Sequence, residues 1–182
     1  MKKIKTLGDC YVASAGILEV TSDHATAIVT FGLEMHNKIA ALQEMDDLKP
    51  IFAKMGPGKR LQIRVGAHSG AVVGGVVGVK KSQFDIWGET VDIANFMESE
   101  GVAQRLHVSN ATWLRSRHKL RESDQKKKFI FESRGMMDLS DCGVNERVET
   151  FLVSLAPEGG GGGRAGSFVE LEDNHEDRKK NQ

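Results

Sequence analysis

The opening segment constrains the fold most, because two short strand-like runs meet there at a glycine and an aspartate. Residues 3–12 predict a strand, a tight turn at Gly8-Asp9 and a second strand. The turn presents one carboxylate, that of Asp9, with Lys5 four positions upstream. Such a tip can hold a metal ion and a nucleotide, although aspartate in a tight turn commonly serves only local hydrogen bonding.

Composition indicates one globular domain and a tail. The chain has 182 residues, of which 40% are hydrophobic and 27% charged, enough to bury a core. Acidic and basic residues number 25 each, so we expect no nucleic-acid partner and no general attraction to an anionic membrane. The longest apolar stretch, residues 70–79, contains four glycines and is too short to cross a bilayer, so no membrane segment is predicted.

Two features bear on the cellular compartment. Residues 1–3 and 13–15 superficially resemble the ends of a signal peptide, but Gly8-Asp9 interrupts the apolar region that such a peptide requires. The two cysteines, Cys10 and Cys142, have neither metal-ligand spacing nor the density of a disulfide scaffold. We therefore expect a reducing compartment.

Apolar spacing predicts an α/β architecture. Residues 23–45 form an amphipathic helix capped by Asp23, and residues 61–68 alternate as a strand whose polar face carries Arg64. Residues 46–60 read as a loop with a short helical turn at 51–55. The remaining expected elements are a strand and turn at 70–79, helices at 89–99 and 110–116, and strands at 105–108, 129–139 and 147–155. Beyond residue 157 the glycine-rich and charged sequence predicts disorder.

The most specific stretch is residues 84–99, Phe-Asp-Ile-Trp-Gly-Glu-Thr-Val-Asp-Ile-Ala-Asn-Phe-Met-Glu-Ser. Together with the opening hairpin, it resembles the class III nucleotide cyclases, the adenylyl and guanylyl cyclases, from about residue 2 to 153. The resemblance implies the cyclase version of the ferredoxin-like α/β sandwich, lacking its first strand and first helices, which we interpret as truncation or a fragment. The expected domains are a partial cyclase domain at 1–156 and a disordered tail at 157–182.

The resemblance implies roles for two charged residues. Asp9 matches one of two carboxylates that hold a pair of Mg²⁺ or Mn²⁺ ions, and Leu7 and Gly8 match the backbone around it. Arg64 matches an arginine that reaches the nucleotide phosphates and would oppose the charge on the leaving pyrophosphate. From the residue alone, Arg64 reads equally well as solvated surface.

Lys5 and Asp85 match the residues that read the base, and Ile86 and Trp87 complete the implied nucleotide-binding stretch. An aspartate accepts the exocyclic amine of adenine and a lysine donates to a ring nitrogen, whereas guanine-reading members carry glutamate and cysteine. ATP is therefore the implied nucleotide, with GTP as the alternative. However, the first catalytic half of two-part adenylyl cyclases keeps the same pair in a site that binds no substrate.

Three positions depart from the family pattern. Asp92 and Phe96, four apart on one helix face, stand where a full site has asparagine and arginine. The segment that begins at Leu139-Ser140 lacks the lysine that would hold phosphates, so Ser140 is a third degenerate position. The family's first metal-binding aspartate is also missing upstream.

These departures imply half of a composite site. We expect the chain to resemble the first half of a two-part adenylyl cyclase, inactive alone and completed by a second cyclase domain, most simply a different one. It would act on the cytoplasmic side, within a larger membrane-attached protein. The alternatives are a guanylyl cyclase half, a pseudo-cyclase that binds nucleotide or only regulates, and an α/β interaction domain that binds no nucleotide.

Overall fold

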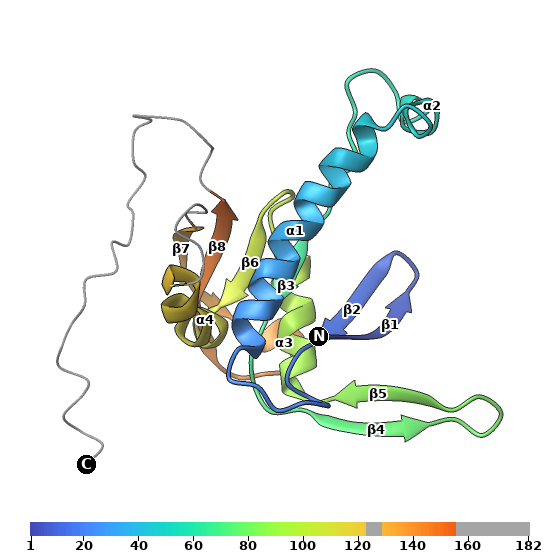
Figure 1. Cartoon of the computed structure of the whole chain (residues 1–182). Coiled ribbons are helices and arrows are strands. Elements are labelled where there is room, and N and C mark those ends of the chain that lie inside the picture. Colours follow the sequence, from blue (N-terminus) through green and yellow to red (C-terminus); the bar gives the residue numbers. More distant parts are fainter. Residues whose placement is uncertain (123–128, 156–182) are drawn as a thin grey trace, which may run out of the picture.

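A computed structural model describes residues 1–122 and 129–155 (Figure 1). Two hairpins and a central sheet contain the strands β1 Lys2–Leu7, β2 Cys10–Ser14, β3 Val65–Ala67, β4 Val73–Val77, β5 Gln83–Trp87, β6 Leu106–Ser109, β7 Phe129–Asp138 and β8 Arg147–Leu155. The helices are α1 His24–Glu44, α2 Lys49–Ala53, α3 Glu89–Ser99 and α4 Asn110–Glu122, with a 3₁₀ turn η1 at Ser140–Cys142. None of the described helices is long and apolar enough to cross a membrane.

The central sheet has four strands in the order β3-β6-β8-β7. β3 and β6 are parallel, while β8 runs antiparallel to both β6 and β7. The β1-β2 and β4-β5 hairpins form two separate two-stranded sheets. The described strands therefore form three separate sheets.

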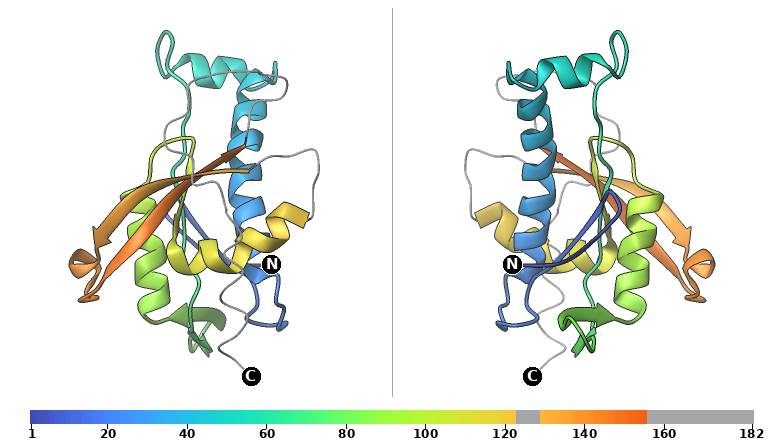
Figure 2. Two further views of the ribbon diagram at one scale, coloured as in Figure 1. Left: turned by 90° about the vertical axis from the view of Figure 1, so that its left-hand side faces the viewer. Right: turned by 90° about the vertical axis from the view of Figure 1, so that its right-hand side faces the viewer.

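Helices cover both faces of the central sheet, as the side views in Figure 2 show. Alternation along β3 explains the arrangement, because Val65 and Ala67 pack toward α1 while Gly66 faces α3. A Cβ on Gly66 would lie 2.1 Å from the backbone nitrogen of Glu98, closer than any real contact. The absence of a side chain at Gly66 is thus what allows α3 to lie against β3.

The main core lies between the sheet and the α1 face. Its buried members come from α1, β3, β6 and β8: Val29, Leu33, Ala67, Leu106, Val108, Phe151 and Val153. Trp113 of α4 stacks on Phe151 with ring centroids 4.7 Å apart. Each large side chain buried here stabilises the fold by about 1.5–3 kcal/mol.

A second core lies on the α3 side. Three residues of α3 pack against the segment around η1, and the buried set is Ile93, Phe96, Met97, Leu139 and Val144. His107 of β6 also faces α3, donating its Nδ1 hydrogen to the Met97 carbonyl at 2.8 Å. The helix is therefore held to the sheet by apolar packing and by a buried hydrogen bond.

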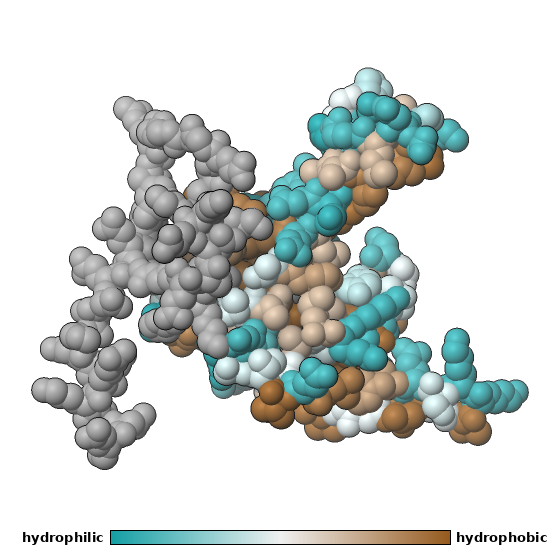
Figure 3. Space-filling model, in the orientation of Figure 1, coloured by the Kyte–Doolittle hydropathy of each residue, from teal (hydrophilic) through white to brown (hydrophobic). Residues whose placement is uncertain are grey.

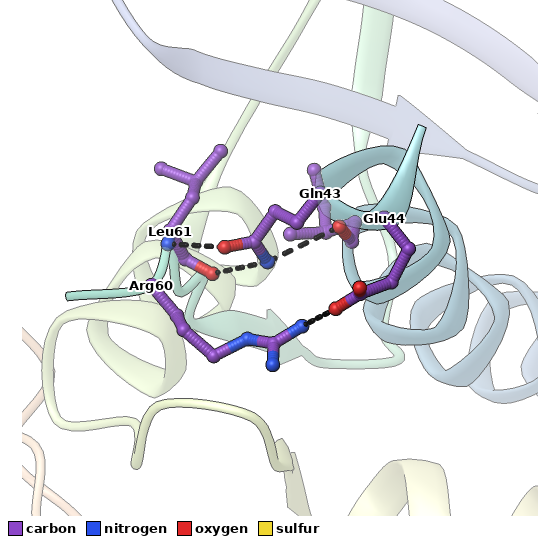
Figure 4. Close-up of polar contacts among 5 residues, drawn as sticks. Gln43, Glu44, Arg60 and Leu61 are labelled. Carbon is purple, nitrogen blue, oxygen red and sulfur yellow. Dashed lines mark hydrogen bonds and ion pairs between the residues drawn. The ribbon is translucent and has the colours of Figure 1, made fainter. Parts of the chain in front are cut away.

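The far end of α1 projects from the body and carries α2 as an arm (Figure 1). Gln43 of α1 binds the segment that follows the arm. Its Oε1 accepts from the Leu61 nitrogen at 2.7 Å, and its Nε2 donates to the Leu61 carbonyl at 3.1 Å. Nearby, Arg60 pairs with Glu44 (Figure 4). One buried amide thus pairs both backbone groups of a residue 18 positions away.

Most sequence-predicted elements are confirmed, and their limits differ in places. The helix at 89–99 is found with those bounds, and Asp23 occupies the N-cap of α1, where its carbonyl accepts from Ala27. The predicted strand 61–68 was wrong in extent, because regular pairing covers only Val65–Ala67. The helix predicted at 110–116 extends to Glu122. The predicted disorder beyond 157 lies outside the described residues.

Candidate active site

The β1-β2 hairpin presents Asp9 at an exposed turn. Leu7 pairs with Cys10, and Gly8 between them has φ +61°, a left-handed conformation that suits glycine. Leu7 and Asp9 are both exposed. The predicted tip therefore exists, with its carboxylate in solvent and open to a ligand.

Lys5 and Asp85 are brought together from strands 80 positions apart in sequence. The Lys5 Nζ lies 2.9 Å from an Asp85 carboxylate oxygen, and each side chain is about one fifth exposed. The other oxygen of Asp85 accepts from the Ile86 nitrogen at 2.8 Å. The hydrogen bond from Lys5, followed by that from Ile86, lowers the pKa of Asp85 below its ordinary value. The carboxylate is therefore ionised and oriented.

The residues that follow Asp85 divide between core and surface. Ile86 is buried, whereas Trp87 is 41% exposed. Phe84 lies against Gly74 of the paired strand, where a Cβ would come within 2.9 Å of its ring. Trp87 thus has an accessible face for a ligand or a partner, while Phe84 supports the hairpin.

Arg64 lies on the α3 side of β3, the polar side predicted from the alternation. Its Nε donates to a Glu98 carboxylate oxygen at 2.9 Å, and half of its side chain is exposed. Among the described residues, its terminal nitrogens make no hydrogen bond. Glu98 therefore aims the guanidinium and leaves donors for an anion. No sequence pattern indicated this partner, because 34 positions separate the two residues.

The degenerate positions do not share one environment. Asp92 is exposed in the first turn of α3, but Phe96 is only 9% exposed and belongs to the second core. Both line a shallow groove that also contains Glu98 and Asp141. Ser140 is exposed at η1, with its nitrogen bonded to Asp138. Phe96 therefore has a packing role that the sequence did not indicate.

The described residues provide only part of the ligand set that the expected metal ion needs. Asp9 offers a single carboxylate, and no group of three acidic, histidine or cysteine side chains that could hold an ion occurs within residues 1–122 and 129–155. A stable Mg²⁺ or Mn²⁺ site needs further oxygen ligands. The described residues alone do not form one.

The sequence of residues 1–154 matches the family described as the adenylate and guanylate cyclase catalytic domain. The fold and the arrangement of the hairpins define a nucleotide cyclase domain, and the chain belongs to the class III nucleotide cyclases.

Similar proteins include adenylyl cyclases. Adenylyl cyclase X E of Drosophila melanogaster is 41% identical over 112 residues, covering 62% of this chain and 9% of that protein. Adenylate cyclase type 9 of Xenopus laevis is 34% identical over 155 residues, covering 84% of this chain and 10% of that protein. The chain thus spans about a tenth of the length of these relatives.

A solved structure supports the fold. The catalytic core of a rhodopsin-guanylyl cyclase with converted specificity, in complex with ATPαS, matches with a TM-score of 0.65 and 28% identity over 85% of this chain and 71% of that one. The predicted cyclase architecture is therefore confirmed at the level of fold.

Proposed function

We propose that this chain forms half of a composite site that converts ATP to cyclic AMP and pyrophosphate. The observation that carries the proposal is Arg64, whose guanidinium is oriented by Glu98 at 2.9 Å and half exposed, so that it can contact a polyphosphate. We assign the choice of base to Lys5 and Asp85, whose charged groups lie 2.9 Å apart on neighbouring hairpins. The ionised carboxylate can accept the exocyclic amine of adenine, and the ammonium can donate to a ring nitrogen. Guanine has a hydrogen-bond acceptor in place of the exocyclic amine and a ring N–H donor in place of the ring-nitrogen acceptor. The pair therefore favours ATP over GTP.

Arg64 would act on the polyphosphate. Its half-exposed guanidinium keeps free donors while Glu98 fixes one edge. A fixed cation is worth most where charge develops, here on the departing pyrophosphate. We assign to Asp9 the role of one ligand to Mg²⁺ or Mn²⁺ in the complete site, with the other ligands supplied from outside the described residues.

A second cyclase domain would supply what this chain lacks. Asp92 repels phosphates, and the buried Phe96 cannot donate a hydrogen bond. The partner would contribute the missing asparagine and arginine, which makes a heterodimer the simplest arrangement. Figure 3 shows hydrophobic surface along the β4-β5 ribbon, where Val73, Val76 and Val77 are exposed, and this surface is suited to the partner. We place the complex on the cytoplasmic side of a membrane-attached protein, with residues 1–156 as the catalytic unit.

Reconstitution tests the proposal. The purified chain should make no cyclic AMP from ATP with Mg²⁺ or Mn²⁺, and adding a cyclase domain that carries the asparagine and arginine should start turnover. Asp9→Ala or Arg64→Ala should then reduce turnover about a hundredfold or more. Asp47→Ala and Arg60→Ala, which change exposed charges on the arm of residues 46–60, are matched controls. Turnover by the chain alone, or activity that survives both site substitutions, would show the proposal to be wrong.

A regulatory pseudo-cyclase is the second possibility, favoured by the buried Phe96. Nucleotide would then raise the melting temperature of the chain without turnover in any mixture. Competition by GTP against ATP in the same assay separates the guanylyl cyclase alternative. An interaction domain without a nucleotide site would show no thermal shift with either nucleotide.

A further inference from the structure

The carboxyl end of α3 is seated on two neighbouring strands, β3 and β6. Gly66 of β3 and His107 of β6 lie directly opposite each other in the parallel pair. Gly66 admits the helix backbone, because a Cβ there would lie 2.5 Å from the Met97 carbonyl carbon. Arg64 shares the face of Gly66 by strand alternation, and its guanidinium meets the Glu98 carboxylate on that face. The position of the carboxylate therefore depends on how this end of α3 is held.

Side chains of the sheet bind carbonyl groups at the end of α3. The last carbonyls of any helix have no partner inside the helix and need donors from elsewhere. The Nδ1 of His107 donates to the Met97 carbonyl at 2.8 Å. Arg134 of β7 donates to the carbonyl of Glu100, the residue that caps the helix. These two bonds hold the backbone on both sides of Glu98.

The His107 ring is a buried donor whose second nitrogen is unused. Burial lowers the pKa of this fully buried ring from its ordinary value of 6.5, so the ring is neutral and carries one N–H. A carbonyl can only accept, so that hydrogen lies on Nδ1. The Nε2 acceptor has no hydrogen-bond partner within the ranges that the structure describes. An unpaired buried acceptor is destabilising, so packing alone does not explain a histidine here.

We propose that His107 is a positioning residue for Arg64 and acts through the end of α3. Its bond to the Met97 carbonyl fixes the adjacent Glu98, whose carboxylate orients the guanidinium. If that bond is lost, the carboxylate shifts with the backbone, and the Arg64 Nε loses its 2.9 Å hydrogen bond. The effect on turnover rests on the proposed function, whereas the effect on the orientation of Arg64 can be measured without it.

Hydrogen exchange at the Arg64 side chain tests the inference in the free 182-residue chain. His107→Leu removes the donor with little change in volume and should make exchange of the Arg64 Nε hydrogen about tenfold faster. His107→Asn keeps a donor at the position of Nδ1 and should leave that exchange close to the unsubstituted rate. His36→Leu, which removes a buried histidine of α1 on the opposite side of the sheet, is the matched control and should have no effect.

Nitrogen-15 NMR of the histidine rings tests the same bond without any substitution. Near neutral pH, the His107 ring should be protonated at Nδ1 and unprotonated at Nε2. A ring protonated only at Nε2 would overturn the proposal, because Nδ1 would then have no hydrogen to donate. An Arg64 exchange rate that His107→Leu leaves unchanged, or that His107→Leu and His107→Asn raise equally, would overturn it too.

Reconstitution with a second cyclase domain separates this inference from the proposed function. His107→Leu should lower kcat for ATP about tenfold with a smaller effect on KM, because an arginine that opposes charge on the departing pyrophosphate acts mainly in the transition state. An unchanged kcat would show that His107 does not position Arg64 for the reaction. No turnover in the unsubstituted mixture would contradict the proposed function, and the exchange and ring measurements would still decide the role of His107.

Discussion

The Lys5 ammonium and the Asp85 carboxylate, 2.9 Å apart, join the β1-β2 hairpin to the β4-β5 ribbon. The two hairpins belong to different sheets, so no backbone ladder connects them. This ion pair links two segments that the proposed nucleotide site requires. Its effect on the Asp85 carboxyl can be measured directly.

Lys5→Met should raise the pKa of Asp85 toward the ordinary value of 3.8, because the largest cause of its lowering is the hydrogen bond from Lys5. Carbon-13 NMR titration of the carboxyl measures the change. Lys3→Met removes a lysine that lies instead over the Tyr11 ring, and should leave the Asp85 pKa unchanged. An Asp85 pKa insensitive to Lys5→Met would mean that the pair does not form in solution.

Gly66→Ala should destabilise the fold by about 3 kcal/mol or more, since its Cβ would overlap backbone atoms of α3 that cannot move independently. Urea unfolding measures the loss. Gly75→Ala is the matched control, because its Cβ would meet only the Trp87 ring at an ordinary 3.6 Å. Equal stabilities for the two variants would contradict the close packing of β3 and α3.

Phe96→Arg, which restores the residue type of a full cyclase site, should cost about 3 kcal/mol or more, because it replaces a core side chain with a buried charge. Asp92→Asn, at an exposed position on the same helix, should change stability by less than about 1 kcal/mol. Thermal unfolding compares them. A fully stable Phe96→Arg would show that this end of α3 can open.

Gln43→Ala should loosen the arm formed by residues 46–60. It leaves the nitrogen and the carbonyl of Leu61 without their buried partner, at a cost of roughly 1–3 kcal/mol. Faster hydrogen exchange at residues 43–61 is the expected sign. Arg60→Ala removes only the exposed pair with Glu44 and should cost less than about 1 kcal/mol. A larger effect from Arg60 would reverse this assignment.

Stability should fall as the pH drops below about 6.5. Burial lowers the pKa values of His36, His68 and His107 from their ordinary 6.5. The unfolded chain therefore binds more protons below that pH, and stability present above it is lost on acidification, by up to about 1.4 kcal/mol per histidine and pH unit. Melting temperatures between pH 8 and 5.5 measure this loss.

His68→Asn retains a polar group for the Ser109 hydroxyl and should reduce the slope by one histidine's share. A melting temperature that stays level or rises on acidification would contradict the neutral state of these buried and partly buried rings.

Local sequence predicted the elements well and their ends less well. Residues 89–99 carry helical periodicity and are followed by Gly101 as a stop signal, and the helix is found with those limits. Strand β3 is shorter than the alternation of 61–68 indicates, because pairing needs a neighbouring strand and β6 reaches only Val65–Ala67. The length of a strand in a sheet depends on its partner strand, and local sequence does not specify that partner.

For the candidate site, the sequence predicted the types of residue but not the contacts between them. The hairpin tip at Asp9 and the polar face of Arg64 follow from a turn and an alternation, which involve only neighbouring residues. Glu98 as the partner of Arg64 and the core position of Phe96 depend on how α3 packs, so only the folded chain determines them.

The sequence by itself determined most of the strands and helices, although not β5, together with the hairpin that carries Asp9 and the family to which the chain belongs, because each depends on local pattern. Tertiary structure decided which distant side chains meet, as Lys5 and Asp85 do across 80 positions, and how the described strands are divided among three sheets. The physical reason is that long-range pairing is set by packing and backbone hydrogen bonding across the whole domain.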